Sequence, residues 1–255
     1  MKRLLLASCV LLALAATTAR AAGVNLTWST GTVGCWPEKQ TNFATWACSN
    51  DTDGPWTIVA SFKMDAAKTD FLGIAAVVDG QSSSASLPDW WQFYNAGACR
   101  QASLTTSADF TAAAKTACRD PFAGAAAGGI GAWQTALYPP PPPLNVPLPN
   151  MCRLKVAYVL ATAKSVPGTY ELYAFRATID AVHTSVTQPL CSGCSTPMCL
   201  VLNQIGIVGS STSYKITSAK DNNVIYWQAR DPYTCPVFST SAGNHTWGQL
   251  KSLYR

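Results

Sequence analysis

The chain has 255 residues and a formal net charge of +5, with only 12% charged residues, nine tryptophans and ten cysteines. A chain of this length can bury a sizeable core without help from disulfides. No run of Lys or Arg forms a basic stripe, so the sequence argues against a nucleic-acid partner. The low charge and the many small polar residues are typical of an extracellular β protein rather than a cytosolic enzyme.

The first 22 residues have the three parts of a secretory signal peptide. Lys2 and Arg3 form the charged start, residues 4–16 are mostly apolar, and residues 19–21 are a small-x-small cleavage motif. The apolar stretch is shorter than the roughly 20 residues that span a bilayer. We therefore expect cleavage near residue 22, a mature protein that is secreted or held at the outer cell surface, and no transmembrane span. Acylation of Cys9 is the alternative.

The first half of the mature chain predicts short strands. Residues 24–33 have the pattern of an edge strand, and turn-forming residues fill 49–55. Residues 56–62 and 71–78 are apolar runs, rich in β-formers and bounded by turn signals, which favours buried strands. Residues 108–118 have the composition of a short helix.

The second half repeats the β pattern after five consecutive prolines at 139–143, which predict a polyproline II crossing loop. The clearest alternation lies at 170–182. There Glu171 shares a face with several apolar residues, and apart from Glu171 we expect this face to meet the core. Other strands are predicted at 152–163, 199–208 and 224–230.

Many short strands and little helix predict an all-β fold, a disulfide-stapled β-sandwich for which a jelly roll is one option. We assign residues 1–22 to the signal peptide, 23–210 to the sandwich and 211–255 to a C-terminal extension.

Nine cysteines follow the leader, and export into an oxidising space predicts disulfides. Proximity in sequence suggests that Cys35 pairs with Cys48 and Cys99 with Cys118, although connectivity cannot be deduced from sequence. The odd number leaves one thiol that is buried, bridged to another chain or reactive, and we expect it in the 191–199 segment. The nine are Cys35, Cys48, Cys99, Cys118, Cys152, Cys191, Cys194, Cys199 and Cys235.

The segment CSGCSTPMC, residues 191–199, also suggests zinc or redox chemistry. A zinc site would need more ligands than this segment supplies, and neither His183 nor His245 has a metal-like spacing. A thiol oxidoreductase with Cys191 and Cys194 remains a minor hypothesis. We expect no metal and no cofactor.

The GxSxG motif of α/β-hydrolases is absent, and no catalytic residue is assigned. Asp89, Trp90 and Trp91 form the strongest ligand-binding candidate, since adjacent aromatics beside a carboxylate are typical of sugar-binding clefts. The alternative is that both tryptophans pack in the core.

The chain ends in TWGQLKSLYR, an aromatic and basic tail. Such an end either docks on its own domain or serves as an address for an export or surface-anchoring machine. The tail residues that would be recognised are Trp247, Gly248, Lys251, Tyr254 and Arg255.

The segments at 87–93, 191–205 and 246–255 resemble a family of uncharacterised secreted proteins from environmental bacteria. The resemblance implies a bacterial, exported protein and carries no activity. The leading hypothesis is an exported, non-enzymatic binding or structural protein at the cell surface or outside the cell. The alternative is a carbohydrate-binding or carbohydrate-active protein, with a glycan as its partner.

Overall fold

The computed structural model describes residues 22–94, 97–137 and 148–229, and its strands form two sheets. The smaller sheet has the order β1-β3-β9-β5, and β6 also pairs with β9. Its strands are β1 (Gly23–Ser29), β3 (Trp56–Lys63), β5 (Leu104–Ser107), β6 (Cys118–Arg119) and β9 (Glu171–Ile179). All of these pairings are antiparallel except that of β6.

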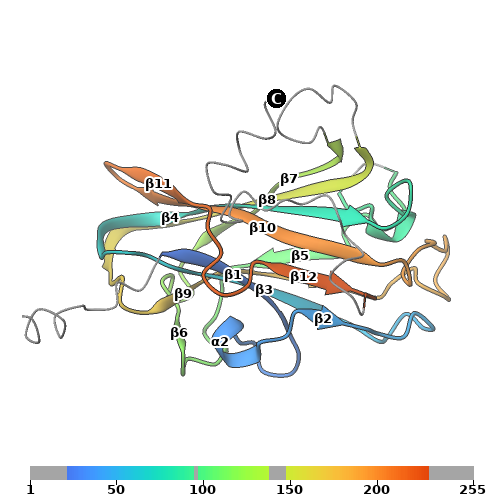
Figure 1. Cartoon of the computed structure of the whole chain (residues 1–255), viewed down its shortest axis with the longest axis horizontal. Helices are drawn as coiled ribbons and strands as arrows, with labels where there is room; N and C mark the ends of the chain where they lie inside the picture. Colours follow the sequence, from blue (N-terminus) through green and yellow to red (C-terminus); the bar gives the residue numbers. More distant parts are fainter. Residues whose placement is uncertain (1–21, 95–96, 138–147, 230–255) are drawn as a thin grey trace, which may run out of the picture.

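The larger sheet has the order β2-β12-β10-β4-β8-β7, and β11 pairs with β10. In Figure 1 its strands β4, β7, β8 and β10 lie above the strands of the smaller sheet. Its strands are β2 (Phe43–Ala44), β4 (Lys68–Ser82), β7 (Ala127–Leu137), β8 (Leu148–Val166), β10 (Met198–Gly209), β11 (Ser213–Ile216) and β12 (Val224–Trp227).

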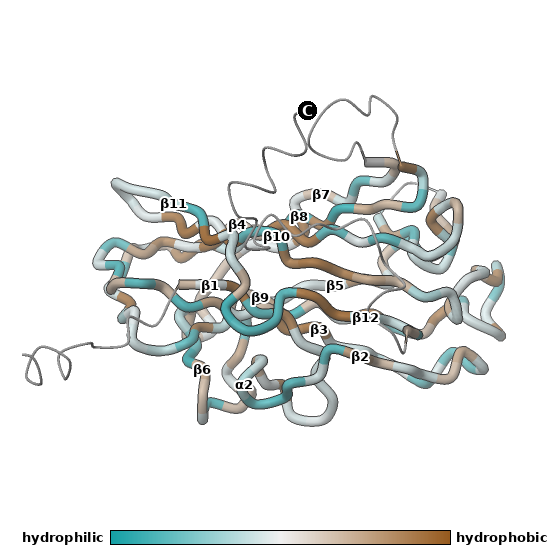
Figure 2. Tube along the Cα trace, viewed as in Figure 1, coloured by the Kyte–Doolittle hydropathy of each residue, from teal (hydrophilic) through white to brown (hydrophobic). Residues whose placement is uncertain are grey.

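Apolar side chains from both sheets meet in one core, which confirms the predicted all-β, two-sheet fold. Hydrophobic stretches run along β10 and β12 in Figure 2, where connecting loops are hydrophilic. Because successive side chains of a strand face opposite sides of a sheet, alternate residues supply this core. Its members include Leu26, Phe62, Ile74, Leu154, Phe175 and Leu202.

The predicted strands at 24–33, 56–62, 71–78, 152–163, 170–182, 199–208 and 224–230 correspond to β1, β3, β4, β8, β9, β10 and β12. The predicted boundary at residue 210 is wrong, because β11 and β12 both pair with β10. Residues 230–255 and the polyproline run lie outside the described residues. No helix in the described part of the chain is long and apolar enough to cross a membrane.

The predicted helix at 108–118 is wrong, because the segment forms turns that lead into β6. The Asp109 carboxylate accepts hydrogen bonds from the backbone N–H and the hydroxyl of Thr111, at 2.9 and 2.7 Å. Such local bonds give the backbone an alternative to helix. The short helices in the described residues are α2 (Trp36–Lys39) and the 3-10 turn η1 (Asp89–Trp91).

A β-bulge at Ala174 changes which side chains of β9 face the core. The register of β9 against β3 shifts there, so one residue of β9 has no counterpart. Because a one-residue insertion exchanges the two faces of a strand, Tyr173 and Glu171 point away from the core that holds Phe175. Tyr173 packs in a second cluster instead. The predicted common face is therefore wrong at its N-terminal end.

The disulfides join Cys35 to Cys118, Cys48 to Cys194 and Cys99 to Cys191. The predicted pairs Cys35–Cys48 and Cys99–Cys118 are both wrong, because the topology brings together residues 83 to 146 positions apart in sequence. Cys35 precedes α2 and Cys118 begins β6, on the outer face of the smaller sheet. The other two bridges tie the loop that follows β9.

Cys152, on β8, is the free cysteine among the described residues, and it is buried. Burial raises the pKa of its thiol, so the group stays protonated and unreactive. Cys199 is disulfide-bonded, and Cys191 and Cys194 are bridged to different partners, so the expectation of a free thiol or a redox pair in this segment is wrong. Cys235 lies outside the described residues.

Candidate functional site

The predicted Asp89–Trp90–Trp91 platform is wrong, because both indole rings are buried in the core. In η1 the rings of Trp90 and Trp91 pack against Trp227, with centroids 4.9 and 5.6 Å away. Asp89 is exposed, whereas the rings of Trp90 and Trp91 are not. The alternative that both tryptophans pack in the core is the one observed.

Arg100 is buried beside these tryptophans and joins several segments at this end of the sandwich. Its guanidinium carbon lies 3.8 Å from the ring centroid of Trp90, and its N–H groups donate to the carbonyls of Trp90 and Val182, each at 3.1 Å. Burial lowers the pKa of Arg100 to about 10, although the Asp180 carboxylate opposes this, so the group stays charged at neutral pH. A buried cation held in this way acts as a structural anchor.

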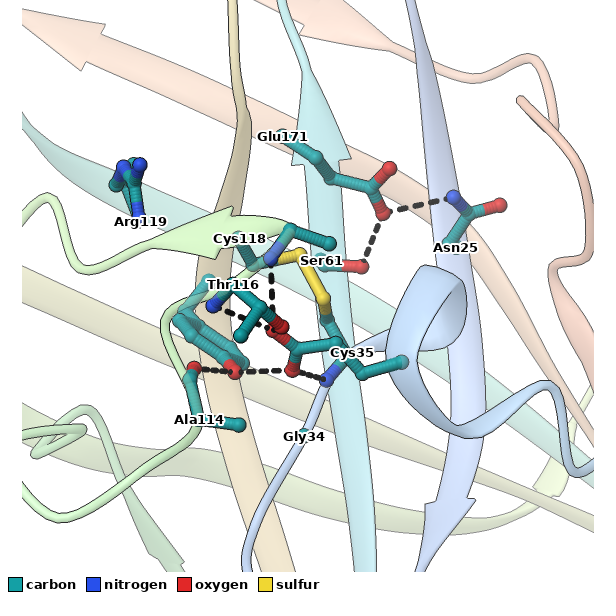
Figure 3. Close-up of a disulfide and its surroundings, with 12 residues drawn as sticks. Asn25, Gly34, Cys35, Ser61, Ala114, Thr116, Cys118, Arg119 and Glu171 are labelled. Atoms are coloured by element: carbon teal, nitrogen blue, oxygen red, sulfur yellow. Dashed lines mark hydrogen bonds between the residues drawn. A yellow bond between two sulfur atoms is a disulfide. The ribbon is translucent and has the colours of Figure 1, made fainter.

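A cleft of about 430 Å³ opens at the other end of β9, within the size range of ligand sites. It lies beside the Cys35–Cys118 disulfide, near α2 and β6 (Figure 3). Its walls come from the end of β3, the start of β9 and the chain after β11. The lining residues are Pro37, Lys63, Ala117, Thr169, Tyr170, Glu171 and Lys220.

Glu171 forms the floor of the cleft and is only 5% exposed. Its Oε1 accepts hydrogen bonds from Asn25 Nδ2 at 2.7 Å and from Ser61 Oγ at 2.6 Å (Figure 3). Its Oε2 accepts none within the described part of the chain, and Lys220 Nζ lies 3.3 Å away. The carboxylate is therefore fixed on one side and paired with a cation on the other.

The cleft brings two lysine side chains, of which Lys63 is only 4% exposed, close to an exposed aromatic ring that Arg119 also contacts. Lys63 Nζ donates to the carbonyl of Thr169 at 2.6 Å, and the guanidinium carbon of Arg119 lies 5.2 Å from the centroid of Tyr170. The Tyr170 side chain is 48% exposed. Burial would lower the pKa of Lys220, but the hydrogen bond that its ammonium group donates to Asp221 and the negative charges of Asp221 and Glu171 raise it overall. The cleft thus combines cations with an apolar surface.

Glu38, the third residue of α2, holds the wall of the cleft in place. Its Oε1 accepts hydrogen bonds from the backbone N–H groups of Thr116 and Ala117, at 3.1 and 2.9 Å. Its Oε2 accepts one from Tyr173 Oη at 2.9 Å and one from Cys35 N at 3.1 Å. This single carboxylate therefore joins α2 to the segment that leads into β6.

Lowering the pH is expected to loosen this wall. Partial burial by itself would raise the pKa of Glu38, but hydrogen bonds from Ala117, Thr116 and Tyr173 outweigh it, so the folded pKa lies below the usual 4.5. The stabilisation by the Glu38 carboxylate is complete above the usual pKa of 4.5 and is lost as the pH falls through the lower pKa of the folded protein. We expect Glu38→Gln to cost about 1 kcal/mol near neutral pH, where water screens a half-exposed carboxylate, and less in acid.

Urea unfolding of both proteins from neutral pH into the acid range checks this expectation. Tyr173→Phe removes one donor to Glu38. It should therefore also reduce the dependence of stability on pH, by a smaller amount than Glu38→Gln does. A stability difference between wild type and Glu38→Gln that does not change with pH would show that the carboxylate has no such role.

No protein-family model matches the chain, and no curated protein matches it significantly. The function proposed for the cleft is therefore inferred from the geometry of its residues. Among the described residues, no group of His, Cys, Asp and Glu side chains is placed to hold a metal ion.

In the sequence, Glu171 is the one acidic residue on an otherwise apolar face; this exception is the available signal for the site, although Glu171 is not among the site residues selected from the sequence. The sequence gives no reason to select Lys63, Tyr170 or Lys220, which reach the cleft from separate strands and loops. The tail residues 247–255, proposed for sorting, lie outside the described residues.

Proposed function

We propose that the protein is an exported, non-enzymatic binding or structural protein whose cleft binds an anionic partner that also presents an apolar group. The observation that carries this proposal is the lining of the cleft, where Lys63 and Lys220 share one hollow with the exposed ring of Tyr170. Arg119 adds a further cation beside that ring. Cations and an apolar face together favour a ligand that has both properties.

The state of Glu171 supports binding rather than catalysis. Among the described residues that line the cleft it is the only one with a carboxylate, and it is nearly inaccessible to solvent. Hydrogen bonds from Asn25 and Ser61 and the charge of Lys220 already hold it. A general acid or base needs to reach the proton that it transfers, whereas a buried counter-ion only fixes the ammonium groups around it. The three disulfides that join described residues fit export into an oxidising compartment.

Titration with anilinonaphthalene sulfonate, a fluorescent probe with one sulfonate and an aromatic surface, tests the cleft. We expect saturable binding to the folded protein that weakens at least about tenfold in Tyr170→Ala and in Arg119→Ala, since each removes a contact worth about 1.4 kcal/mol or more. Tyr214→Ala is the matched control, because Tyr214 is also an exposed tyrosine but lies on β11 outside the cleft. Binding that is equal in all four proteins, or absent from the wild type, would contradict the proposal.

A further inference from the structure

Three apolar residues of the larger sheet are buried on its outer face, away from the core. Met151 on β8 and Cys199 and Val201 on β10 are 3%, 1% and 1% exposed. They belong to neither of the two hydrophobic clusters that the described residues form. Because the residues next to them in the strands, such as Cys152 and Leu200, face the core, these three side chains face outward. We call Met151, Cys199 and Val201 the outer patch.

The outer patch is part of one row of side chains across neighbouring strands. Gln81 on β4 pairs with Met151 on one side and with Cys199 on the other, and Cys199 pairs with Tyr226 on β12. The ring of Tyr226 stacks on that of Phe43 on β2, with the centroids 4.9 Å apart. The strands β8, β4, β10 and β12 lie side by side in the sheet (Figure 1). The row is therefore a continuous surface that one extended segment can cross.

Asp79 is buried beside this row, only 4% exposed, and its charge is paired. Arg153 Nε and Nη2 donate to its Oδ1 and Oδ2 at 2.6 and 2.7 Å, and Asn203 Nδ2 donates to Oδ2 at 2.7 Å. A carboxylate with such partners can be buried without water. Farther along the same face of β8, Val159 is 44% exposed. Burial is thus confined to one end of the outer face, which indicates that a further segment of chain lies over that end.

Cys199 indicates which segment this is. It is disulfide-bonded, whereas Cys152 is free and the other bridged cysteines of the described residues pair with one another. Its partner therefore lies outside the described residues, at Cys9 or at Cys235. Cys9 falls within the expected signal peptide, whereas Cys235 is six residues after position 229, the last described residue. Because six residues can extend about 20 Å and Tyr226 is adjacent to Cys199, Cys235 is within reach of this partner.

We propose that the C-terminal segment from residue 230 onward lies on the outer patch and is joined to it by a disulfide between Cys199 and Cys235. The segment has the side chains that such a cover requires. Tyr233 and Val237 lie two residues before and two residues after Cys235, so in an extended chain they share its face. The face that carries the bridge would therefore bring an aromatic ring and a valine onto the outer patch. This cover is independent of the cleft and of the function proposed for it.

Closing this bridge is an oxidation of two thiols. The Cys199 and Cys235 thiols lose two protons and two electrons as their S–S bond forms. A disulfide-bearing oxidant of the oxidising compartment accepts both by thiol–disulfide exchange and is itself reduced to two thiols. The bridge closes a loop of 36 positions, a length at which a cross-link stabilises the closed state and so holds the segment on the sheet.

Peptide mapping of the oxidised, full-length protein tests the bridge. Cyanogen bromide cleaves after methionine, and Met198 directly precedes Cys199, so this reagent followed by trypsin separates Cys199 from the two cysteines before it. We expect fragment 199–215 to be recovered linked to fragment 231–251, which contains Cys235, and to be released from it by reduction. Fragment 199–215 linked to any other fragment, or a free thiol at Cys235, overturns the proposal.

Oxidation of methionines by hydrogen peroxide tests the cover, because a buried thioether is protected from the reagent. Met64 is fully buried in the core and serves as the internal standard. In the wild type, we expect Met151 of the outer patch to react as slowly as Met64. In the double variant Cys199→Ser/Cys235→Ser, Met151 should react at least about tenfold faster, because the segment above it then opens locally, while Met64 is unchanged.

Removing the Cys35–Cys118 bridge is the matched control, because that bridge lies on the outer face of the smaller sheet and its loss should leave Met151 protected. Fast oxidation of Met151 in the wild type overturns the cover. Protection of Met151 that survives in the double variant overturns the role of the bridge. The mapping and the wild-type rate use the native protein, so they decide the proposal whether or not the double variant folds.

Discussion

Replacing Trp227 with alanine is expected to lower the free energy of unfolding by about 4 kcal/mol, as for other large aromatic side chains lost from a core. Trp227 is fully buried on β12, and its Nε1 donates a hydrogen bond to the carbonyl of Cys194 at 2.5 Å. Its ring lies at the centre of an aromatic cluster. The rings whose centroids lie within 4.7 to 5.8 Å of it are those of Trp28, Trp46, Trp56, Trp90 and Trp91.

Urea unfolding, followed by circular dichroism because the substitution alters the fluorescence, measures this loss. Trp227→Phe keeps a ring in the cluster and should cost clearly less than the alanine variant. Tyr214→Ala, at an exposed position on β11, should change the stability by less than about 0.5 kcal/mol. If Trp227→Ala cost no more than this control, the ring would not be a packed part of the core.

The aromatic cluster also shows what sequence could and could not predict. Alternating and apolar runs identified most strands, because a period of two residues is a local property of the chain. Six of the nine tryptophans meet in the cluster although they lie between positions 28 and 227. Trp90 and Trp91 were therefore open to two interpretations, since only the pairing of distant strands decides whether neighbouring rings are buried or exposed.

A single inserted residue in β9 explains why the sequence did not predict the candidate site. Before the bulge at Ala174, β9 turns Glu171 and Tyr173 to the outer face, where α2 and the segment before β6 cover them. A strict alternation places both residues on the face of Phe175, and it predicts that Tyr173 meets the core. Bulges depend on how a strand pairs with its neighbour, so the sequence of one strand rarely reveals them. Glu171, the polar residue on the predicted apolar face, still indicates that the simple alternation fails at the start of β9.

Removing the Cys48–Cys194 disulfide, by changing both cysteines to alanine, is expected to cost about 4 to 5 kcal/mol. The bridge joins residues separated by 146 positions, and the chain-entropy model assigns a larger stabilisation to longer loops. The bridge is also linked to the aromatic cluster through Gln228. Its Nε2 donates to Cys48 Sγ at 3.2 Å and to the carbonyl of Trp46, a member of the cluster, at 2.6 Å. Urea unfolding of this double variant against the wild type measures the cost, and a loss below about 2 kcal/mol would contradict the expectation.

The loss of this bridge should not add to the loss of Trp227, because the indole N–H of Trp227 donates to the backbone of Cys194 itself. In a thermodynamic cycle, we expect the combined variant to differ from the sum of the two separate losses by more than about 0.5 kcal/mol. The Cys35–Cys118 bridge provides the control, because it packs with Tyr173 in the second cluster. Its removal should add to Trp227→Ala within about 0.5 kcal/mol. Equal coupling in both cycles would mean that the aromatic cluster responds to disulfide loss in general, whereas coupling confined to Cys48–Cys194 would place the two groups in one cooperative unit.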